Sequence, residues 1–446
     1  MLLTRELWRR HASGIAAAAI ALYLAITPAA YLIAARPAGT RFAPYIAYHG
    51  ALTLLMLLAW AALRRAPRPS LVLAVVVAGV IARLLLIGAP SFTSTDVSRY
   101  LWDGAVVVHG QDPYALAPGS PALASLAADF PAPIDHTDVP TCYPPLAVAL
   151  FAMSAATGPG AAWIAWKMLV ALASIATLLL VWSHLRSGER AADVALLALG
   201  PLALLESGVG GHLDALVALA VTVAVVAAAA GHMRSAALAI GCAAALKLVP
   251  GVLAIVIVRR ATRRVQVALL CALPLALSVA VALWLRVTPL GSLPLVAQTW
   301  SFGSPAWALA TWLWPDDGGA SRLALLAFGL ALVLVMAWRR PLVAAMQEAF
   351  GATLAVSPTL YPWYASALAP LVALRPTAWS VALVAVLPTS YEVLDAYQAR
   401  GEWLPAQWPI VLVAVAPLVA TLARSILTTR PSSLASPLRA PQASIT

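Results

Sequence analysis

The chain has 446 residues, of which 62% are hydrophobic and only 10% are charged, and its formal net charge is +11. Soluble domains are typically about a quarter charged, so this composition excludes a protein surrounded by water and indicates one that crosses a lipid bilayer many times. The positive charge does not predict a nucleic-acid partner, because arginines cluster in short segments between apolar blocks, as expected of cytoplasmic loops.

The apolar blocks predict helices, because a chain inside hydrocarbon must satisfy its backbone hydrogen bonds internally. The first three expected spans cover residues 13–35, 45–63 and 71–88. Arginines precede the first span and follow the second, so we place the N-terminus in the cytoplasm and the segment after the third span outside it.

A long extracytoplasmic loop is expected over residues 89–158. Its first part, 89–141, is polar and rich in Pro, Asp and aromatic residues. Long loops in compact proteins are usually functional or disordered, and the aromatic residues favour an ordered, functional loop. Its last part, 143–158, is apolar but short, and we expect a helix that lies along the outer interface. A segment that does not span lets 161–182 run inward and places the basic residues after it in the cytoplasm.

The later apolar blocks raise the expected number of spans to about 11–13. The block 236–258 has basic residues at both ends, which favours a re-entrant hairpin broken at Pro250. The fold class is therefore an all-α polytopic transmembrane helical bundle, with one domain over 1–430 and a disordered cytoplasmic tail over 431–446. The further spans cover residues 161–182, 192–205, 215–230, 265–285, 323–338, 343–357, 365–374, 378–391 and 409–426.

Three charged residues follow the third span at the start of the long loop. Asp96, Arg99 and Asp103 are spaced i, i+3 and i+7, so they share one face of a helix. One carboxylate could accept a proton while Arg99 holds an anion. The alternative is an Asp N-cap beside a surface salt bridge.

Glu206, His212 and Asp214 lie in a glycine-rich turn between two spans. These side chains could bind sugar hydroxyls or a divalent cation, although their spacing is not diagnostic of a metal site. We assign no metal ligand and no certain cofactor, and a capped interhelical turn would explain the same pattern. The three scattered cysteines indicate neither a disulfide framework nor a zinc site.

Lys167 and Lys247 are the only lysines in the chain, and both lie in apolar blocks. A lysine there needs a partner such as a phosphate or a carboxylate, unless its amine reaches the membrane interface. For Lys247 the candidates are Glu206, Asp214 and the phosphate of a ligand, and we favour the phosphate.

Six segments resemble, in the same order, motifs of the bacterial polytopic glycosyltransferases of the GT-C superfamily, including mannosyltransferases that use polyprenyl-phosphate-linked sugar. The chain departs from the family pattern at Thr95, Ser98, Asp112 and Gly210, where the family carries Asp, Tyr, Asn and Asn. The chain contains no asparagine at all. The six segments are residues 95–104, 110–114, 141–146, 206–214, 247–250 and 357–364.

The resemblance implies an inverting transfer of a sugar, with mannose the expected one, from a polyprenyl-phosphate donor to a lipid or glycan acceptor at the outer face of the plasma membrane. Asp96 is the implied general base, and Asp103 is the second catalytic candidate. Arg99 and Lys247 would gather the phosphate charge, and three aromatic residues would line a groove for the donor lipid. The implied substrate-binding residues are Arg99, Tyr100, Tyr114, Tyr143, Glu206, His212, Asp214, Lys247, Tyr361, Trp363 and Tyr364.

The competing interpretation is a transporter or flippase of a lipid-linked or small anionic substrate. Broken helices and charges inside the membrane are features of transporters as well. The polar motifs of this chain gather at one face of the expected bundle, which favours an interfacial enzyme whose partners also include membrane lipids.

Overall fold

The computed structural model describes residues 2–130, 135–315 and 318–428, and the expected tail at 431–446 lies outside them. Within these ranges every named element is a helix, apart from isolated bridges of Phe302 and Gly303 to Thr359, which confirms the all-α class. The long helices are α1 (Leu2–Ile26), α3 (Phe42–Arg65), α4 (Pro69–Leu85), α7 (Pro159–Leu185), α10 (Asp214–Ala229), α13 (Arg264–Trp284), α16 (Gly319–Arg339), α17 (Leu342–Val356) and α21 (Gln407–Thr428).

Shorter helices lie in the segments that connect the long ones. They are α2 (Ala29–Ala34), α5 (Asp96–Val108), η1 (Pro121–Leu123), η2 (Leu126–Ala128), α6 (Pro145–Ala155), α11 (Met233–Leu246), α12 (Ala254–Arg260), α14 (Leu293–Thr299) and α15 (Pro305–Leu313). The C-terminal part adds η6 (Pro362–Ala367), α18 (Ala369–Leu374), α19 (Ala378–Val386), η7 (Leu387–Glu392) and α20 (Val393–Arg400).

Six helices in the described part of the chain are long and apolar enough to cross a membrane. A bent pair, Ala191–Ala198 with Pro201–Gly210, would be a seventh if it crosses as one span. Helices of spanning length are therefore fewer than the 11–13 expected, because shorter apolar helices of 10–17 residues build much of the bundle.

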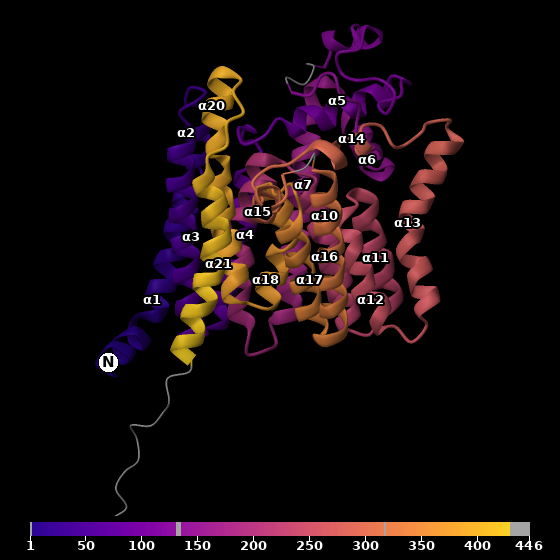
Figure 1. Ribbon diagram of the computed structural model, residues 1–446. Helices are drawn as coiled ribbons and strands as arrows, with labels where there is room; N and C mark the ends of the chain where they lie inside the picture. The colour runs from indigo at the N-terminus through magenta and orange to yellow at the C-terminus, as the bar shows by residue number, and fades with distance from the viewer. Residues whose placement is uncertain (1, 131–134, 316–317, 429–446) are drawn as a thin grey trace, which may run out of the picture.

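The bundle has two chemically different ends (Figure 1). We call the end that carries α5, α6 and α14 the loop end, and the opposite end, where α12 is linked to α13, the arginine end. The arginine end takes its name from the cluster at residues 259–264. The long loop and this cluster thus lie at opposite ends of the bundle, as the arginine distribution predicts.

The segment 192–205 is not the continuous helix that the sequence suggested. It consists of η3 (Ala191–Val194), α8 (Ala195–Ala198) and α9 (Pro201–Leu205), and the pair is bent by 45°. Pro201 explains the break, because proline has no N–H to donate and its ring clashes with the carbonyl of the preceding turn.

A buried arginine stabilises this break. Arg83 of α4 is fully buried and donates from Nη2 to the Leu197 carbonyl and from Nη1 to the Ala198 carbonyl, both at 3.0 Å. These carbonyls end α8, where the helix dipole favours a cation. The sequence motifs do not indicate Arg83, although an arginine inside an apolar block was a signal for it.

The block 236–258 is broken at Lys247 rather than at Pro250. Helix α11 ends at Leu246, Lys247 is extended, and Pro250 lies in the first turn of η5 (Val249–Leu253), where its missing N–H costs little. The C-terminal end of α11 meets the start of α10, whereas Arg260 at the end of α12 reaches the Arg340 carbonyl after α16. The block therefore enters and leaves at the arginine end, as a hairpin does.

Cysteine labelling can test which end faces the cytoplasm. In a background without the native cysteines, we expect a membrane-impermeant maleimide added to intact cells to label Ser125→Cys in the exposed part of the long loop. Thr262→Cys, also exposed, should react only after the membrane is permeabilised. Labelling of Thr262→Cys alone in intact cells would contradict the assigned orientation.

Candidate active site

Asp96 is the first residue of α5 and lies at the loop end. Its Oδ2 accepts a hydrogen bond from the Tyr100 hydroxyl at 3.0 Å, and its backbone N–H donates to Ser94 Oγ at 3.0 Å. The side chain is 26% exposed. Asp96 is thus a helix-starting carboxylate, favoured by the helix dipole, that remains open to a ligand.

Arg99 and Asp103 form a structural pair instead of an open anion site. Arg99 Nε donates to Asp103 Oδ1 at 2.9 Å, and its other nitrogens donate to the carbonyls of His136 at 3.1 Å and Val139 at 2.7 Å. Arg99 therefore ties the long loop to α5, and Asp103 is buried behind it. These contacts favour the salt-bridge alternative, with the pair buried rather than on the surface.

The pKa values of the two carboxylates of α5, Asp96 and Asp103, shift in opposite directions. Burial works to raise the pKa of Asp96, but the neighbouring His212, with hydrogen bonds from Tyr100 and Ser94, holds it below its ordinary value. Burial raises the pKa of Asp103, and the opposing charge of Arg99 does not overcome it. When the pKa values of two neighbouring titratable groups shift in opposite directions, the two groups can play different chemical roles. Here Asp96 is the carboxylate that favours the ionised form and that a substrate could reach.

His212 lies between two carboxylates. Its Nδ1 is 3.4 Å from Asp96 Oδ2, and its Nε2 is 3.3 Å from Glu206 Oε2. Both distances exceed the usual N–H···O range, and neither ring nitrogen has a hydrogen-bond partner among the described residues, so these are close contacts rather than hydrogen bonds. The Tyr391 hydroxyl contacts both oxygens of Glu206, at 3.0 and 2.9 Å, and the imidazole stacks on Trp363 with ring centroids 4.2 Å apart.

The turn that carries Glu206 and His212 is a π-helical segment, η4 (Glu206–Gly210), followed by Gly211 with φ of +67°. A Cβ at Gly210 would lie 2.4 Å from His212 Cδ2, so the imidazole occupies the space that a larger residue would need. Glycine at position 210, where the resembled family has asparagine, is therefore required by the position of His212 in this chain.

Lys167 holds this turn from α7. Its amine is fully buried and donates to the carbonyls of Gly208 and Val209, while Trp166 Nε1 donates to the Gly211 carbonyl at 2.7 Å. The expected phosphate or carboxylate partner is not found among the described residues. Carbonyls of the π-helical segment take its place.

Lys247 does have a carboxylate partner. Its amine lies 2.8 Å from Asp214 Oδ1 and 3.0 Å from Oδ2, and 3.9 Å from the centroid of the Tyr364 ring. The lysine side chain is 20% exposed, whereas the Asp214 side chain is only 5% exposed. The favoured phosphate is thus not needed to explain Lys247 in the ligand-free protein, and Asp214 is the correct one of the two carboxylate candidates.

The aromatic residues near the site are largely engaged with one another. Phe302, Tyr361 and Trp363 stack in sequence, with centroids 4.7 and 4.4 Å apart, and Trp363 continues onto His212. Trp363 is buried and so supports the imidazole. Tyr361 and Tyr364 remain partly exposed, and their expected place beside a donor lipid stays a prediction.

The remaining tyrosine candidates are part of the scaffold. Tyr100 is buried and stacks on Phe151 at 4.5 Å, with Tyr143 edge-on at 5.3 Å, and Tyr114 donates to the Tyr143 carbonyl at 2.8 Å. Gly104 allows α5 to approach α6, since a Cβ there would meet the Phe151 carbonyl oxygen at 2.3 Å. Of these tyrosines, Tyr100 alone hydrogen-bonds Asp96 among the described contacts.

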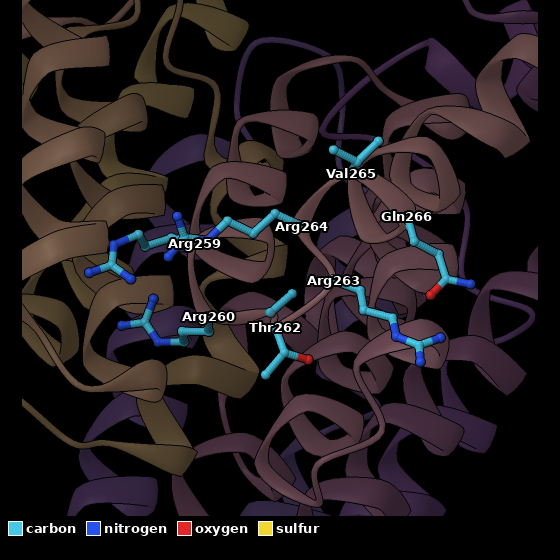
Figure 2. A pocket seen from close by; sticks show the side chains of 8 residues that line it. Arg259, Arg260, Thr262, Arg263, Arg264, Val265 and Gln266 are labelled. Atoms are coloured by element: carbon cyan, nitrogen blue, oxygen red, sulfur yellow. The ribbon is translucent and has the colours of Figure 1, made fainter.

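No group of three or more His, Cys, Asp or Glu in the described part of the chain is placed to hold a metal ion, and a cation requirement stays a prediction. A cavity of about 730 Å³ lies elsewhere, at the arginine end, and is lined by residues 259–266 (Figure 2). Its side chains spread around the link between α12 and α13. This cavity is far from Asp96 and does not belong to the candidate site.

Comparison with known proteins gives one match. A family model described as alpha-(1->6)-mannopyranosyltransferase, N-terminal domain, of the MptA_B family matches residues 11–263. The matched region includes Asp96, Glu206, His212 and Lys247 and ends before the aromatic segment at 357–364. No curated protein and no solved structure matches the chain.

Proposed function

Because the chain belongs to the MptA_B family of alpha-(1->6)-mannopyranosyltransferases, we propose that it transfers mannose from a polyprenyl-phosphate donor to a lipid or glycan acceptor outside the cytoplasm. The observation that carries the proposal is the state of Asp96. It is the carboxylate of α5 that is partly exposed, and the surrounding hydrogen bonds favour its ionised form.

In the proposed reaction, Asp96 takes the proton of the acceptor hydroxyl as its oxygen attacks the anomeric carbon. The bond between that carbon and the phosphate oxygen breaks, and the polyprenyl phosphate leaves with the electron pair. An inverting transfer that makes an α bond requires a donor whose mannose is β-linked to the phosphate.

Lys247 is the cation that we assign to the leaving phosphate. It is partly exposed and held by the buried Asp214 carboxylate. Arg99 is a weaker candidate than the sequence suggested, because its guanidinium donors already bind Asp103 and the long loop. A positioned ammonium group stabilises charge that develops on a leaving phosphate.

A reconstituted transfer assay tests the proposal. Purified protein in liposomes should convert a mannoside acceptor only with synthetic polyprenyl-phosphate-β-mannose, and not with the α-linked donor or with nucleotide-diphosphate mannose. Mass spectrometry and linkage analysis should show one added hexose in an α-(1→6) bond. Use of the nucleotide sugar would refute the donor class, and movement of the donor across the bilayer without product would indicate a flippase.

The lowered pKa of Asp96 predicts the acidic limb of the pH profile. A general base works when it is deprotonated, so activity is retained above its pKa and is lost as the pH falls through it. Since this pKa lies below the ordinary aspartate value of about 3.9, we expect Asp96 itself to cause no loss of kcat/KM between neutral pH and about pH 4. A loss in this range that persists in Glu206→Gln would contradict this assignment.

A further inference from the structure

We propose that Glu206 and His212 are positioning residues that act on Asp96 through a carboxylate–imidazole–carboxylate chain, and that neither of them binds the sugar. The proposal rests on the proposed transfer at Asp96. Its first support is the geometry, since each ring nitrogen of His212 faces a different carboxylate, at 3.4 Å and 3.3 Å.

The donors and acceptors of an imidazole suit this carboxylate–imidazole–carboxylate arrangement. A neutral imidazole donates from one nitrogen only, whereas an imidazolium donates from both. With a carboxyl oxygen facing each nitrogen, either tautomer of the imidazole points its N–H toward one of the two carboxyl groups. Tyr391 supplies its hydroxyl to both oxygens of Glu206, which holds that carboxyl group beside the imidazole.

Burial separates the members of the chain into inner and outer parts. His212 is fully buried and Glu206 is buried to 2% exposure, so a sugar hydroxyl has no access to either. The imidazole is fixed between Trp363, on which it stacks, and the backbone of Gly210, which leaves no room for a Cβ. Asp96 is the one member that reaches the open side of the site.

The other charged groups described around His212 do not take the place of Asp96 or Glu206 beside the imidazole. The titratable and charged groups on the elements that surround His212 include Tyr45, Tyr100, Lys167, Asp214, Lys247, Tyr361, Tyr364 and Tyr391. Lys167 donates hydrogen bonds to backbone carbonyls, and Lys247 is paired with the Asp214 carboxylate. Asp96 and Glu206 therefore remain as the charged contacts of the imidazole.

The chain would fix one oxygen of the base and leave the other for chemistry. Both His212 Nδ1 and the Tyr100 hydroxyl approach Asp96 Oδ2, so we assign the proton of the acceptor to Oδ1. The imidazole helps to hold the pKa of Asp96 below its ordinary value and, with Tyr100, sets the direction of the carboxylate.

Glu206→Gln is the first test, because it removes the charge at the far end of the chain and keeps the shape. We expect kcat to fall by about 10- to 100-fold, with the KM values for donor and acceptor unchanged. The acidic limb of kcat/KM should also move, since His212 sets the pKa of Asp96 and Glu206 lies on the other side of the imidazole. Substrate binding by Glu206 would instead raise a KM and leave the limb in place, which would overturn the proposal.

Tyr391→Phe tests the same chain if Glu206→Gln fails to fold. Removal of the hydroxyl that contacts Glu206 should shift the limb in the same direction with a smaller loss of kcat. Tyr23→Phe is the matched control, because Tyr23 is also buried but its hydroxyl has no hydrogen-bond partner among the described residues. An unchanged limb in Tyr391→Phe, equal to that of Tyr23→Phe, would overturn the proposal.

Asp96→Asn, measured in the same liposome assay, separates this inference from the function on which it rests. If Asp96→Asn is inactive while Glu206→Gln behaves as wild type, the chain is refuted and the transfer at Asp96 stands. If Asp96→Asn remains active, both the assigned base and the chain that serves it are refuted.

Discussion

Asp96→Asn should abolish measurable transfer while the protein remains folded and membrane-inserted. The amide cannot accept the proton of the acceptor hydroxyl, and loss of a general base typically lowers the rate by about a hundredfold to ten-thousandfold. The change keeps the shape of the side chain, and an asparagine oxygen can still accept from Tyr100. The measurements are initial transfer rates in liposomes and thermal unfolding in detergent.

Asp103→Asn is the matched control, since it makes the same chemical change on the same helix. Asp103 is buried and paired with Arg99, so its loss should lower the unfolding temperature and loosen the long loop rather than remove the base. An active Asp96→Asn beside a folded but inactive Asp103→Asn would show that the base is Asp103.

Lys247→Met should lower the unfolding temperature of the donor-free protein and also weaken donor binding. The stability effect follows from the structure, because Asp214 is almost completely buried and would lose its cation. Removal of one partner from a buried ion pair costs about 3–5 kcal/mol, and the partial exposure of Lys247 places this pair at the lower end of that range. Thermal shift with and without polyprenyl-phosphate mannose measures both effects.

The double variant Lys247→Met/Asp214→Asn should recover part of the stability lost in Lys247→Met, because no charge is left unpaired. It should not recover donor binding. Arg400→Met is the control for loss of a cation from an exposed pair, here with Glu402, and should change stability by less than about 1 kcal/mol. If Lys247→Met leaves the donor-free protein as stable as wild type, the Lys247–Asp214 pair has no structural role.

Several features of the fold followed directly from local sequence. The first two spans, the helix at 161–182 and the short apolar helix near 145–155 appear close to their expected positions. The break before Pro201 is a local signal of the same kind, because proline cannot continue a preceding helix. Hydropathy and proline effects act over a few turns of one helix, so they can be read without knowing the neighbours.

The composition and motifs of the sequence by themselves determined that this protein is a helical, multi-pass membrane protein and which segments carry its polar residues. Only the tertiary structure decided what each polar side chain binds. Arg99 binds a carbonyl of the long loop, and Lys247 binds Asp214. His212 lies between Asp96 and Glu206. The physical reason is sequence separation. Tyr391 contacts a carboxylate 185 residues earlier, and a buried charge takes whichever partner the packing of distant helices brings within hydrogen-bond distance.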